Sequence, residues 1–221
     1  VSRDMFGPLW PGFDPDEVPI GSITNGVHAP TWTARELVEL GTQTTSQGDP
    51  LEVDGDVHFD GVDRIPAAEL WRTRRLLRGR LVEEVRRRVR ATALSRGAAE
   101  AELGWTETAF DPDVLTIGFA RRVPSYKRLT LMLRDPARLK ALLLDPERPI
   151  QLVIAGKSHP ADDGGKQLIQ QMVKFADDPA VRHRIAFLPG YDIGMARYLY
   201  WGCDVWLNNP LRPLEACGPS G

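Results

Sequence analysis

Four cationic side chains, Arg121, Arg122, Lys127 and Arg128, follow a continuous apolar run within eight positions, and their types and spacing suit phosphate chemistry. The run, residues 114–120, is typical of a central parallel strand that is covered on both faces. Ligands of open α/β sheets bind outside the carboxyl ends of the strands, and guanidinium and ammonium groups placed there suit a phosphate dianion. Spacing alone leaves an alternative open, a solvated cationic cluster at the start of a helix.

A second candidate anion site lies in the last loop, where Glu215 is followed by the small residues Cys217, Gly218 and Ser220. The backbone N–H groups at the amino terminus of a helix favour an anionic ligand, and small side chains let it approach. A carboxylate in the same loop can accept hydrogen bonds from sugar hydroxyls. Two anion sites and a carboxylate on one sheet edge predict a reaction between phosphate and carbohydrate, with a structural glycine turn as the alternative.

The elements that must position these residues form a regular βα alternation. Apolar runs at 150–155, 184–188 and 203–207 predict three further strands, and helices are expected near 129–143, 165–175 and 193–200. Right-handed crossovers make this pattern a doubly wound parallel sheet. Polar residues follow each of the three strands: Lys157, Ser158 and His159, then Gly190, Tyr191 and Asp192, then Asn208 and Asn209. Four such loops in register indicate a site along the carboxyl edge.

Upstream, four prolines and one tryptophan among few polar residues predict an irregular packed arm at residues 6–20, and a long helix is expected over residues 67–94. The arginines of that helix are compatible with nucleic-acid binding, but acidic residues elsewhere favour a solvated surface helix. Between these segments a predicted turn contains Asn25 and, seven residues later, Trp32. An amide and an indole close together can bind a sugar or an aromatic cofactor, or they can simply pack against each other. We divide the chain into residues 1–112, which lead into the domain, and residues 113–221, a truncated Rossmann-like part.

Composition excludes several classes of protein. The chain has 221 residues and a net charge of -2, which gives no bias toward polyanions such as nucleic acid. No apolar run is long enough to span a bilayer, and the amino terminus does not have the pattern of a signal peptide, so a cytoplasmic location is expected. The two cysteines fit neither a disulfide framework nor a zinc site, and no metal is expected.

Six ordered motifs together resemble one family. They are the turn at 24–32, the cationic loop at 122–128, residues 155–157, 187–191 and 204–210, and the Glu215 loop. In these motifs the chain resembles the alpha-glucan (glycogen, starch or maltodextrin) phosphorylases, especially their shorter bacterial branch. The resemblance implies a GT-B glycosyltransferase of two Rossmann-like domains that uses pyridoxal phosphate. Such an enzyme cleaves alpha-1,4-glucan with inorganic phosphate to give glucose 1-phosphate, and this chain would carry the first part of its carboxy-terminal domain.

The resemblance also implies roles for individual residues. Arg122 and Lys127 match residues that hold the attacking phosphate, and Arg121 matches a cation beside the cofactor phosphate. Five positions match family residues that bind the glucose unit at the cleavage point: Asn25, Tyr126, Glu215, Cys217 and Gly218. Four further positions match family residues near the cofactor: Trp32, Tyr191, Pro219 and Ser220.

Two departures from the family pattern fall in the last loop, where Cys217 replaces a serine and Pro219 a threonine. The resemblance places the Schiff-base lysine just beyond Gly221, and the amino-terminal domain that supplies the other wall of the cleft is also missing. The 221 residues alone are therefore expected to be inactive. Oligomeric state stays open. Two alternatives remain, a GT-B glycosyltransferase that uses a nucleotide sugar and a glucan-binding module without catalysis.

Overall fold

The computed structural model describes residues 2–23, 26–44, 62–123 and 127–211, which fall into two compact units. The described part of the smaller unit ends at Val27 and contains α1 (Ser2–Phe6) and the short 3-10 helix η1 (Gly7–Leu9). Arg3 holds the arm by donating hydrogen bonds to the carbonyl oxygens of Asp16 and Ile20, at 2.9 and 3.0 Å. Within this unit Val18 is buried, whereas most of the large apolar side chains are exposed, so the arm is less packed than predicted.

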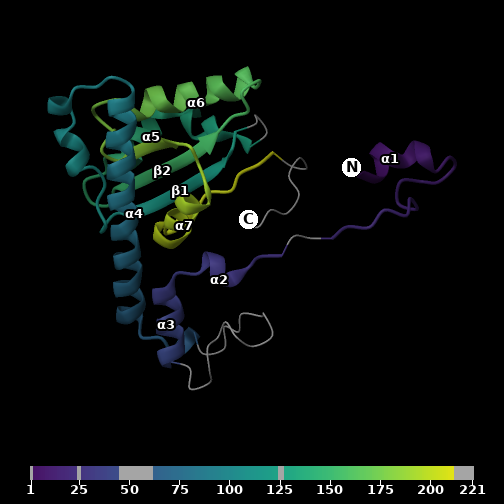
Figure 1. Ribbon diagram of the computed structural model, residues 1–221, viewed down its shortest axis with the longest axis horizontal. Helices are drawn as coiled ribbons and strands as arrows, with labels where there is room; N and C mark the ends of the chain where they lie inside the picture. Colours follow the sequence, from purple (N-terminus) through teal and green to yellow (C-terminus); the bar gives the residue numbers. More distant parts are fainter. Residues whose placement is uncertain (1, 24–25, 45–61, 124–126, 212–221) are drawn as a thin grey trace. The chain divides into compact units, whose positions relative to one another are not determined.

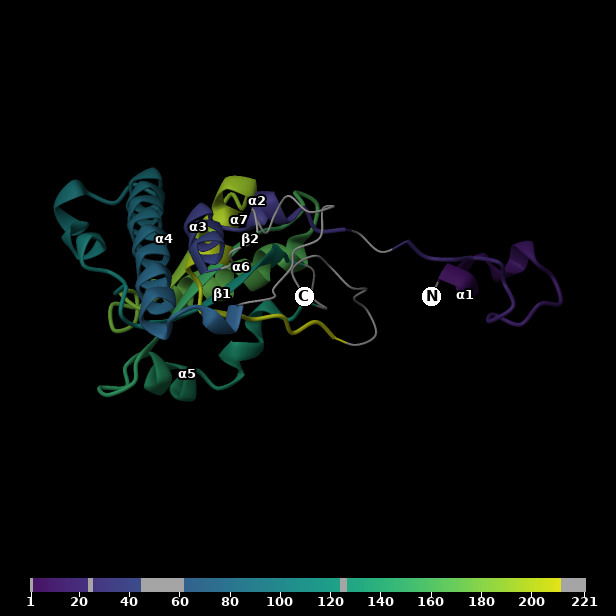
Figure 2. The ribbon, with the colours of Figure 1, turned by 90° about the horizontal axis from the view of Figure 1, so that it is seen from below.

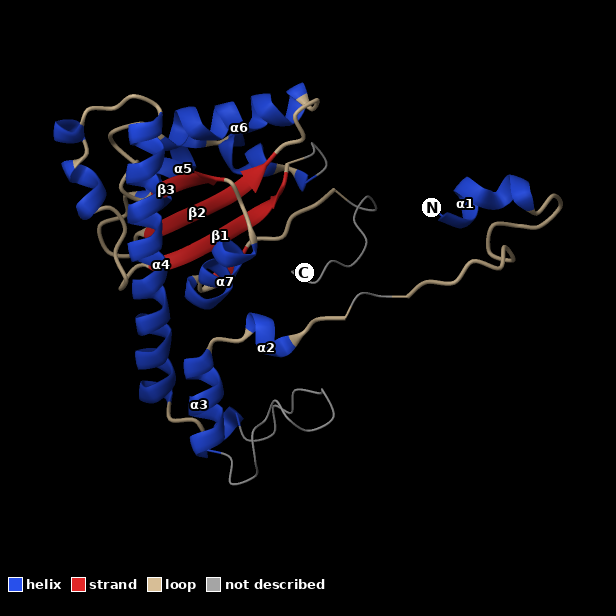
Figure 3. Cartoon of the chain, in the orientation of Figure 1, coloured by secondary structure: helices blue, strands red, loops and turns tan. Residues whose placement is uncertain are grey.

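The larger unit, which begins at His28, is built on a parallel sheet with strand order β3-β2-β1-β4 (Figures 1 and 3). Its strands are β1 (Leu115–Arg122), β2 (Ile150–Lys157), β3 (Ile185–Pro189) and β4 (Val205–Trp206). The pairs β1–β2, β1–β4 and β2–β3 all run parallel. The expected α/β class with an open, doubly wound parallel sheet is therefore confirmed. The division of the chain after residue 112 stays a prediction.

Helices cover both faces of this sheet, which explains why its strands read as continuous apolar runs. One face packs against α4 (Ala67–Ser95) and α7 (Ile193–Gly202), with Leu81, Val85, Met195 and Leu199 in its core. The other face packs against α5 (Pro136–Leu143) and α6 (Asp163–Ala176), with Leu139 and Met172 in its core. Figure 2 shows α5 and α7 on opposite sides of β1.

Some arginines of α4 depart from the expectation of a solvated surface helix, whereas Arg72, Arg75 and Arg87 are exposed, as expected. Arg78 is 1% exposed and forms an ion pair with Asp204 at 2.7 Å. Arg74 donates to the carbonyl oxygen of Trp201 at 2.5 Å, and Arg86 donates to the carbonyl oxygen of Ala109 at 2.7 Å. These arginines bind backbone and side-chain oxygens of the segments around the sheet, because long side chains can cross the apolar surface of the helix to reach them. Arg74, Arg78 and Arg86 therefore stabilise the packing of α4.

The single helix expected near 129–143 is two elements, the 3-10 helix η6 (Leu129–Arg134) and α5. Pro136 causes the break, since the residue before a proline is disfavoured in the helical region. Asp135 has φ -129° and ψ 82°, and its side chain accepts a hydrogen bond from the backbone N–H of Arg138 at 2.9 Å. An aspartate followed by a proline thus ends one helix and caps the next.

The remaining described helices lie outside the sheet layers. They are α2 (Ala29–Trp32), α3 (Arg35–Thr44), and the short 3-10 turns η2 (Val62–Arg64), η3 (Glu100–Glu102) and η4 (Gly104–Glu107). Helix α4 has 29 residues, enough to cross a bilayer, but its many arginines make it too polar to do so. In the described residues, none of the helices combines the length and apolar character of a membrane span.

Candidate functional site

The candidate site lies where the strand order changes direction. From β1 the chain builds the sheet outward through β2 and β3, and then returns to place β4 on the other side of β1. Ligands of doubly wound sheets bind at such a switch point, outside the carboxyl ends of the strands. Arg121 and Arg122 are the last two residues of β1, so they stand at this position. The sequence prediction had placed both in the loop, whereas the strand continues through them.

A hollow of about 690 Å³ opens at this edge of the sheet. It brings Arg122 and Lys127 together, as the sequence predicted for a phosphate-binding pair, and adds Lys157 from the end of β2. Arg122 and Lys157 are exposed, and Lys127 is half-buried. Among the described residues, the lining is Arg122, Val123, Lys127, Lys157, Ser158, His159, Pro160 and Asp162. Three cations around one concave surface can bind a phosphate group or a phosphate ester.

Glycine lets helix α6 begin close to this hollow. A Cβ added at Gly165 would lie 2.6 Å from the carbonyl oxygen of Val123 and 2.4 Å from Ser158 Oγ, which is closer than real side chains come. Asp162 caps the helix, and its Oδ1 accepts a hydrogen bond from the Gly165 N–H at 2.8 Å. The small residue at position 165 therefore fixes the distance between α6 and the ends of β1 and β2.

Arg128 joins the loop after β1 to the chain that follows β4. Its Nε donates to the carbonyl oxygen of Asn209 at 2.7 Å, and its terminal nitrogen donates to that of Pro210 at 3.4 Å. The backbone at Arg128 has φ 50°, in the left-handed region that residues other than glycine seldom adopt. Strain held by tertiary contacts is typical of functional loops. Arg128 thus ties together the two loops that flank the switch point.

Two of the aromatic residues predicted near a cofactor contact the same tyrosine. Trp32 packs edge-on against Tyr200, with ring centroids 5.3 Å apart, and Tyr200 lies 4.5 Å from the ring of Trp206. Tyr191 is half-buried and forms a hydrogen bond with Tyr200; burial, followed by the interactions with Tyr200, raises the pKa of Tyr191 above its usual range. Tyr191 therefore stays a neutral phenol, and Trp32, Tyr191, Tyr200 and Trp206 form one aromatic cluster.

Arg121 is close enough to this cluster for its charge to lower the pKa of Tyr191, against the larger effect of burial. It is only 5% exposed, in contrast to its neighbour Arg122. Trp206 Nε1 and Asn209 Oδ1, both on the chain around β4, are buried without a hydrogen-bond partner in the part of the chain that the structure describes. Buried polar atoms of this kind usually have a partner, so these two are free to bind a ligand or a neighbouring segment.

Seven of the predicted site residues lie outside the described residues. They are Asn25, Tyr126, Glu215, Cys217, Gly218, Pro219 and Ser220. The sequence prediction included Lys157 among the polar residues at the carboxyl edge but gave it no individual role, and it did not assign a site role to Tyr200 or Trp206. The position of Lys157 at the end of a strand was a usable signal, because it corresponds to that of Arg122. Tyr200 and Trp206 lie in apolar segments, and the sequence alone does not distinguish them from ordinary core residues.

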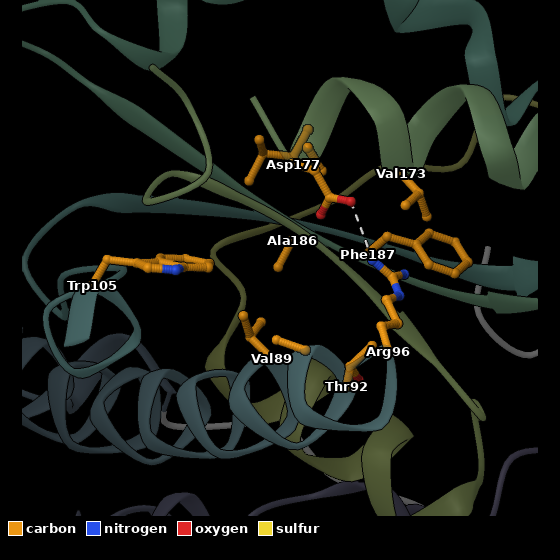
Figure 4. Close-up of a pocket in the computed structure, with 11 residues that line it drawn as sticks. Val89, Thr92, Arg96, Trp105, Val173, Asp177, Ala186 and Phe187 are labelled. Carbon is orange, nitrogen blue, oxygen red and sulfur yellow. Dashed lines mark hydrogen bonds and ion pairs between the residues drawn. The ribbon is translucent and has the colours of Figure 1, made fainter. Parts of the chain in front are cut away.

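A smaller cavity of about 60 Å³ has a different character (Figure 4). It lies between α4, α6 and β3, with mainly apolar side chains such as Val89, Trp105 and Ala186 around it. Arg96 lines it too, but forms an ion pair with Asp177 at 3.1 Å. An apolar cavity whose cation is already paired is not suited to a phosphate group. Over the described ranges, moreover, no group of three or more His, Cys, Asp or Glu residues could hold a metal ion.

Comparison with known proteins connects this arrangement to glucan phosphorylases. Over all 221 residues the chain is 67% identical to glycogen phosphorylase of Mycobacterium tuberculosis and 43% identical to glycogen phosphorylase of Aquifex aeolicus. It is 38% identical over 223 aligned residues to maltodextrin phosphorylase of Thermococcus litoralis. No protein-family model matches the chain.

Each of these alignments covers the whole chain but only part of the relative. The chain spans 25% of the Mycobacterium protein, 32% of the Aquifex protein and 26% of the Thermococcus protein. The resemblance to alpha-glucan phosphorylases that the motifs indicated is confirmed, and it extends over the full length of the chain.

Proposed function

We propose that this chain is the first part of the carboxy-terminal GT-B domain of an alpha-glucan phosphorylase. The complete enzyme would cleave alpha-1,4-glucan with inorganic phosphate and release glucose 1-phosphate. The observation that carries the proposal is the placement of Arg122 and Lys127 in one hollow at the switch point of the sheet. The names of the relatives, glycogen and maltodextrin phosphorylase, support the same reaction.

In the proposed reaction Arg122 and Lys127 bind and orient the attacking phosphate. Phosphate carries up to two negative charges, and positioned cations stabilise the charge that develops on its oxygens as the sugar departs. Arg122 stands on a strand, and Lys127 lies on the loop that Arg128 fixes to Asn209. The backbone that carries Arg122 is therefore fixed, and that of Lys127 adjoins a fixed residue, which limits the positions that the two charged groups can take and lowers part of the entropic barrier to reaction. Glu215 would accept hydrogen bonds from the glucose hydroxyls, and the amide of Asn25 could accept hydrogen bonds from them or donate to them.

The described residues also fit pyridoxal phosphate, a planar aromatic phosphate ester. The aromatic cluster around Tyr200 offers Trp32 and Tyr191 as packing surfaces, and Arg121 places a buried cation beside Tyr191. When bound, the cofactor supplies a phosphate group that can exchange a proton with the substrate phosphate. Arg121 would hold this phosphate and keep it ionised, while Trp32 and Tyr191 would exclude water from the ring. Cofactor content, measured by its absorbance after release from Arg121→Met and parent proteins, tests this assignment.

The reaction is tested with the full-length protein that contains this chain. We expect glucose 1-phosphate to form from maltodextrin only when phosphate is present. Arg122→Ala and Lys127→Ala should each lower kcat/KM for phosphate by about thirtyfold or more, the effect of losing a charged contact. Arg148→Ala is the matched control, because Arg148 is exposed and precedes β2, at the opposite end of that strand from the hollow.

Other outcomes would support the two alternatives. Glucose transfer from a nucleoside diphosphate glucose, without phosphorolysis, would indicate that the same cations bind a diphosphate. Binding of glycogen without any turnover would indicate a glucan-binding module. Unchanged efficiency toward phosphate in both variants would contradict the roles of Arg122 and Lys127.

A further inference from the structure

We infer that Lys157 is a third cation of the phosphate site and binds the substrate phosphate together with Arg122 and Lys127. This inference rests on the proposed function and adds a residue that the resemblance does not assign. Lys157 ends β2 as Arg122 ends β1, and the Cα atoms of the two residues are partners in the parallel register. Neighbouring strands lie roughly 5 Å apart, so both long side chains start from adjacent points and line the same hollow.

Two of the cations around the hollow, Arg122 and Lys157, have no carboxylate partner among the described residues. Among the described lining residues only Asp162 has a carboxylate, and its Oδ1 accepts the Gly165 N–H as the cap of α6. Neither Arg122 nor Lys157 forms an ion pair with any carboxylate in the described part of the chain, whereas Lys140 and Lys166 pair with Asp178 and Asp163. Cations gathered on one surface repel one another, and an anionic ligand with several charges removes that repulsion.

The loop after Lys157 is held rigidly, as a binding site requires. Ser158 Oγ donates to the carbonyl oxygen of Asp162 at 3.1 Å, and the Asp162 N–H donates to that of His159 at 2.9 Å. His159 Nδ1 accepts the N–H of Ala161 at 3.1 Å. The end of β2 is therefore followed by a closed turn, so the backbone that carries Lys157 is fixed on both sides.

The number of cations indicates which form of phosphate is bound. Two cations are enough to neutralise a dianion, and a third favours the dianion over the monoanion because each added positive charge lowers the second pKa of phosphate. The same three cations can bind the phosphate of glucose 1-phosphate, the product of the proposed reaction. Lys157 should therefore affect both inorganic phosphate and glucose 1-phosphate, and should have little effect on the glucan chain.

The experiment compares Lys157→Gln, Lys157→Arg and the control Lys174→Gln in the full-length protein. Lys174 is an exposed lysine of α6 that does not line the hollow. We expect Lys157→Gln to raise KM for inorganic phosphate and for glucose 1-phosphate about five- to thirtyfold, the effect of one solvent-accessible charged contact. KM for maltodextrin should change less than about twofold, and Lys157→Arg should recover most of the loss because it keeps the charge.

A second measurement does not depend on turnover. Inorganic phosphate should raise the Tm of the parent and of Lys174→Gln, and should raise that of Lys157→Gln less at the same concentration. Cofactor content is measured in each variant, so that loss of the cofactor is not mistaken for loss of substrate phosphate.

The outcomes separate this inference from the proposed function. A parent protein that forms no glucose 1-phosphate contradicts the proposed function, while the effect of phosphate on Tm still decides the role of Lys157. If the parent is active and Lys157→Gln has the same KM for phosphate as Lys174→Gln, Lys157 does not bind phosphate. The inference is also wrong if Lys157→Arg is as impaired as Lys157→Gln, or if the glutamine variant loses the cofactor and keeps its phosphate affinity.

Discussion

Gly165 offers a sharp test of how the fold sets the dimensions of the proposed phosphate site. In Gly165→Ala the new methyl group would lie 2.4 Å from Ser158 Oγ, 2.5 Å from Asp162 Oδ2 and 2.6 Å from the carbonyl oxygen of Val123. The carbonyl belongs to the backbone and cannot rotate away, so α6 or the end of β1 must move. Overpacking of this kind costs about 1–3 kcal/mol.

Gly164→Ala is the matched control, because the adjacent glycine has room. Its added methyl group would meet only Asp162 Oδ1, at an ordinary 3.5 Å. Alanine is favoured over glycine in a helix by about 0.5–1 kcal/mol, and both substitutions gain this term. The difference between them therefore isolates the overpacking, and Gly165→Ala should be less stable than Gly164→Ala by about 1–3 kcal/mol.

Urea unfolding of the full-length protein measures this difference, and steady-state kinetics measure its effect on the site. Since Val123, Ser158 and Asp162 all line the hollow, Gly165→Ala should also raise KM for phosphate, and Gly164→Ala should not. If Gly165→Ala is as stable as Gly164→Ala and keeps the parent KM, the close approach of α6 does not shape the site, and the reasoning is refuted.

Two further predictions concern stability. Burial, followed by the charges of two neighbouring arginines, lowers the pKa of His183 below its usual 6.5, so the unfolded chain binds more protons below that pH. The free energy of unfolding should fall as pH drops from about 7 to 5, and urea titrations of His183→Gln should show a shallower slope; equal slopes would show that His183 is not involved. Ala186→Val should fill part of the 60 Å³ cavity and raise the free energy of unfolding by about 0.5–1.5 kcal/mol, whereas Ala155→Val, at a buried strand position outside that cavity's lining, should lower it. Valine variants with equal effects in urea would contradict this reading of the cavity.

The sheet was predictable from the sequence because its strands are short apolar runs separated by helical segments of ordinary length. Buried parallel strands have no polar alternation, and the predicted ends of β1 and β2 are correct to within two residues. Strand order follows from crossover rules only in part. The position of β4 beside β1 creates the switch point and goes together with the packing of α7 against α4, a contact between segments far apart in the sequence.

The arginines of α4 show why charge patterns are a weaker guide than apolar patterns. Arg78 reads as a surface residue because it is one of many arginines in the same helix, but it is 1% exposed and paired with Asp204, 126 residues away. A buried guanidinium group needs a partner of this kind, and the identity of that partner depends on the tertiary structure. Periodicity does not show which distant residues form a pair, so ion pairs that fix a helix to the sheet are identified only when the fold is known.

Strand geometry alone could have predicted that the adjacent residues Arg121 and Arg122, at the end of β1, bind two different ligands. Successive side chains of a strand point to opposite faces, so Arg121 and Arg122 are not expected to bind one small anion from the same side. Their burial agrees with this geometry, because Arg121 is 5% exposed beside Tyr191, whereas Arg122 is exposed and lines the phosphate hollow. This separation supports the proposal that two phosphate groups meet at the end of one strand, with Arg121 at the cofactor phosphate and Arg122 at the substrate phosphate. The two variants should then differ in kind, with Arg121→Met losing cofactor and Arg122→Ala keeping cofactor but losing affinity for phosphate.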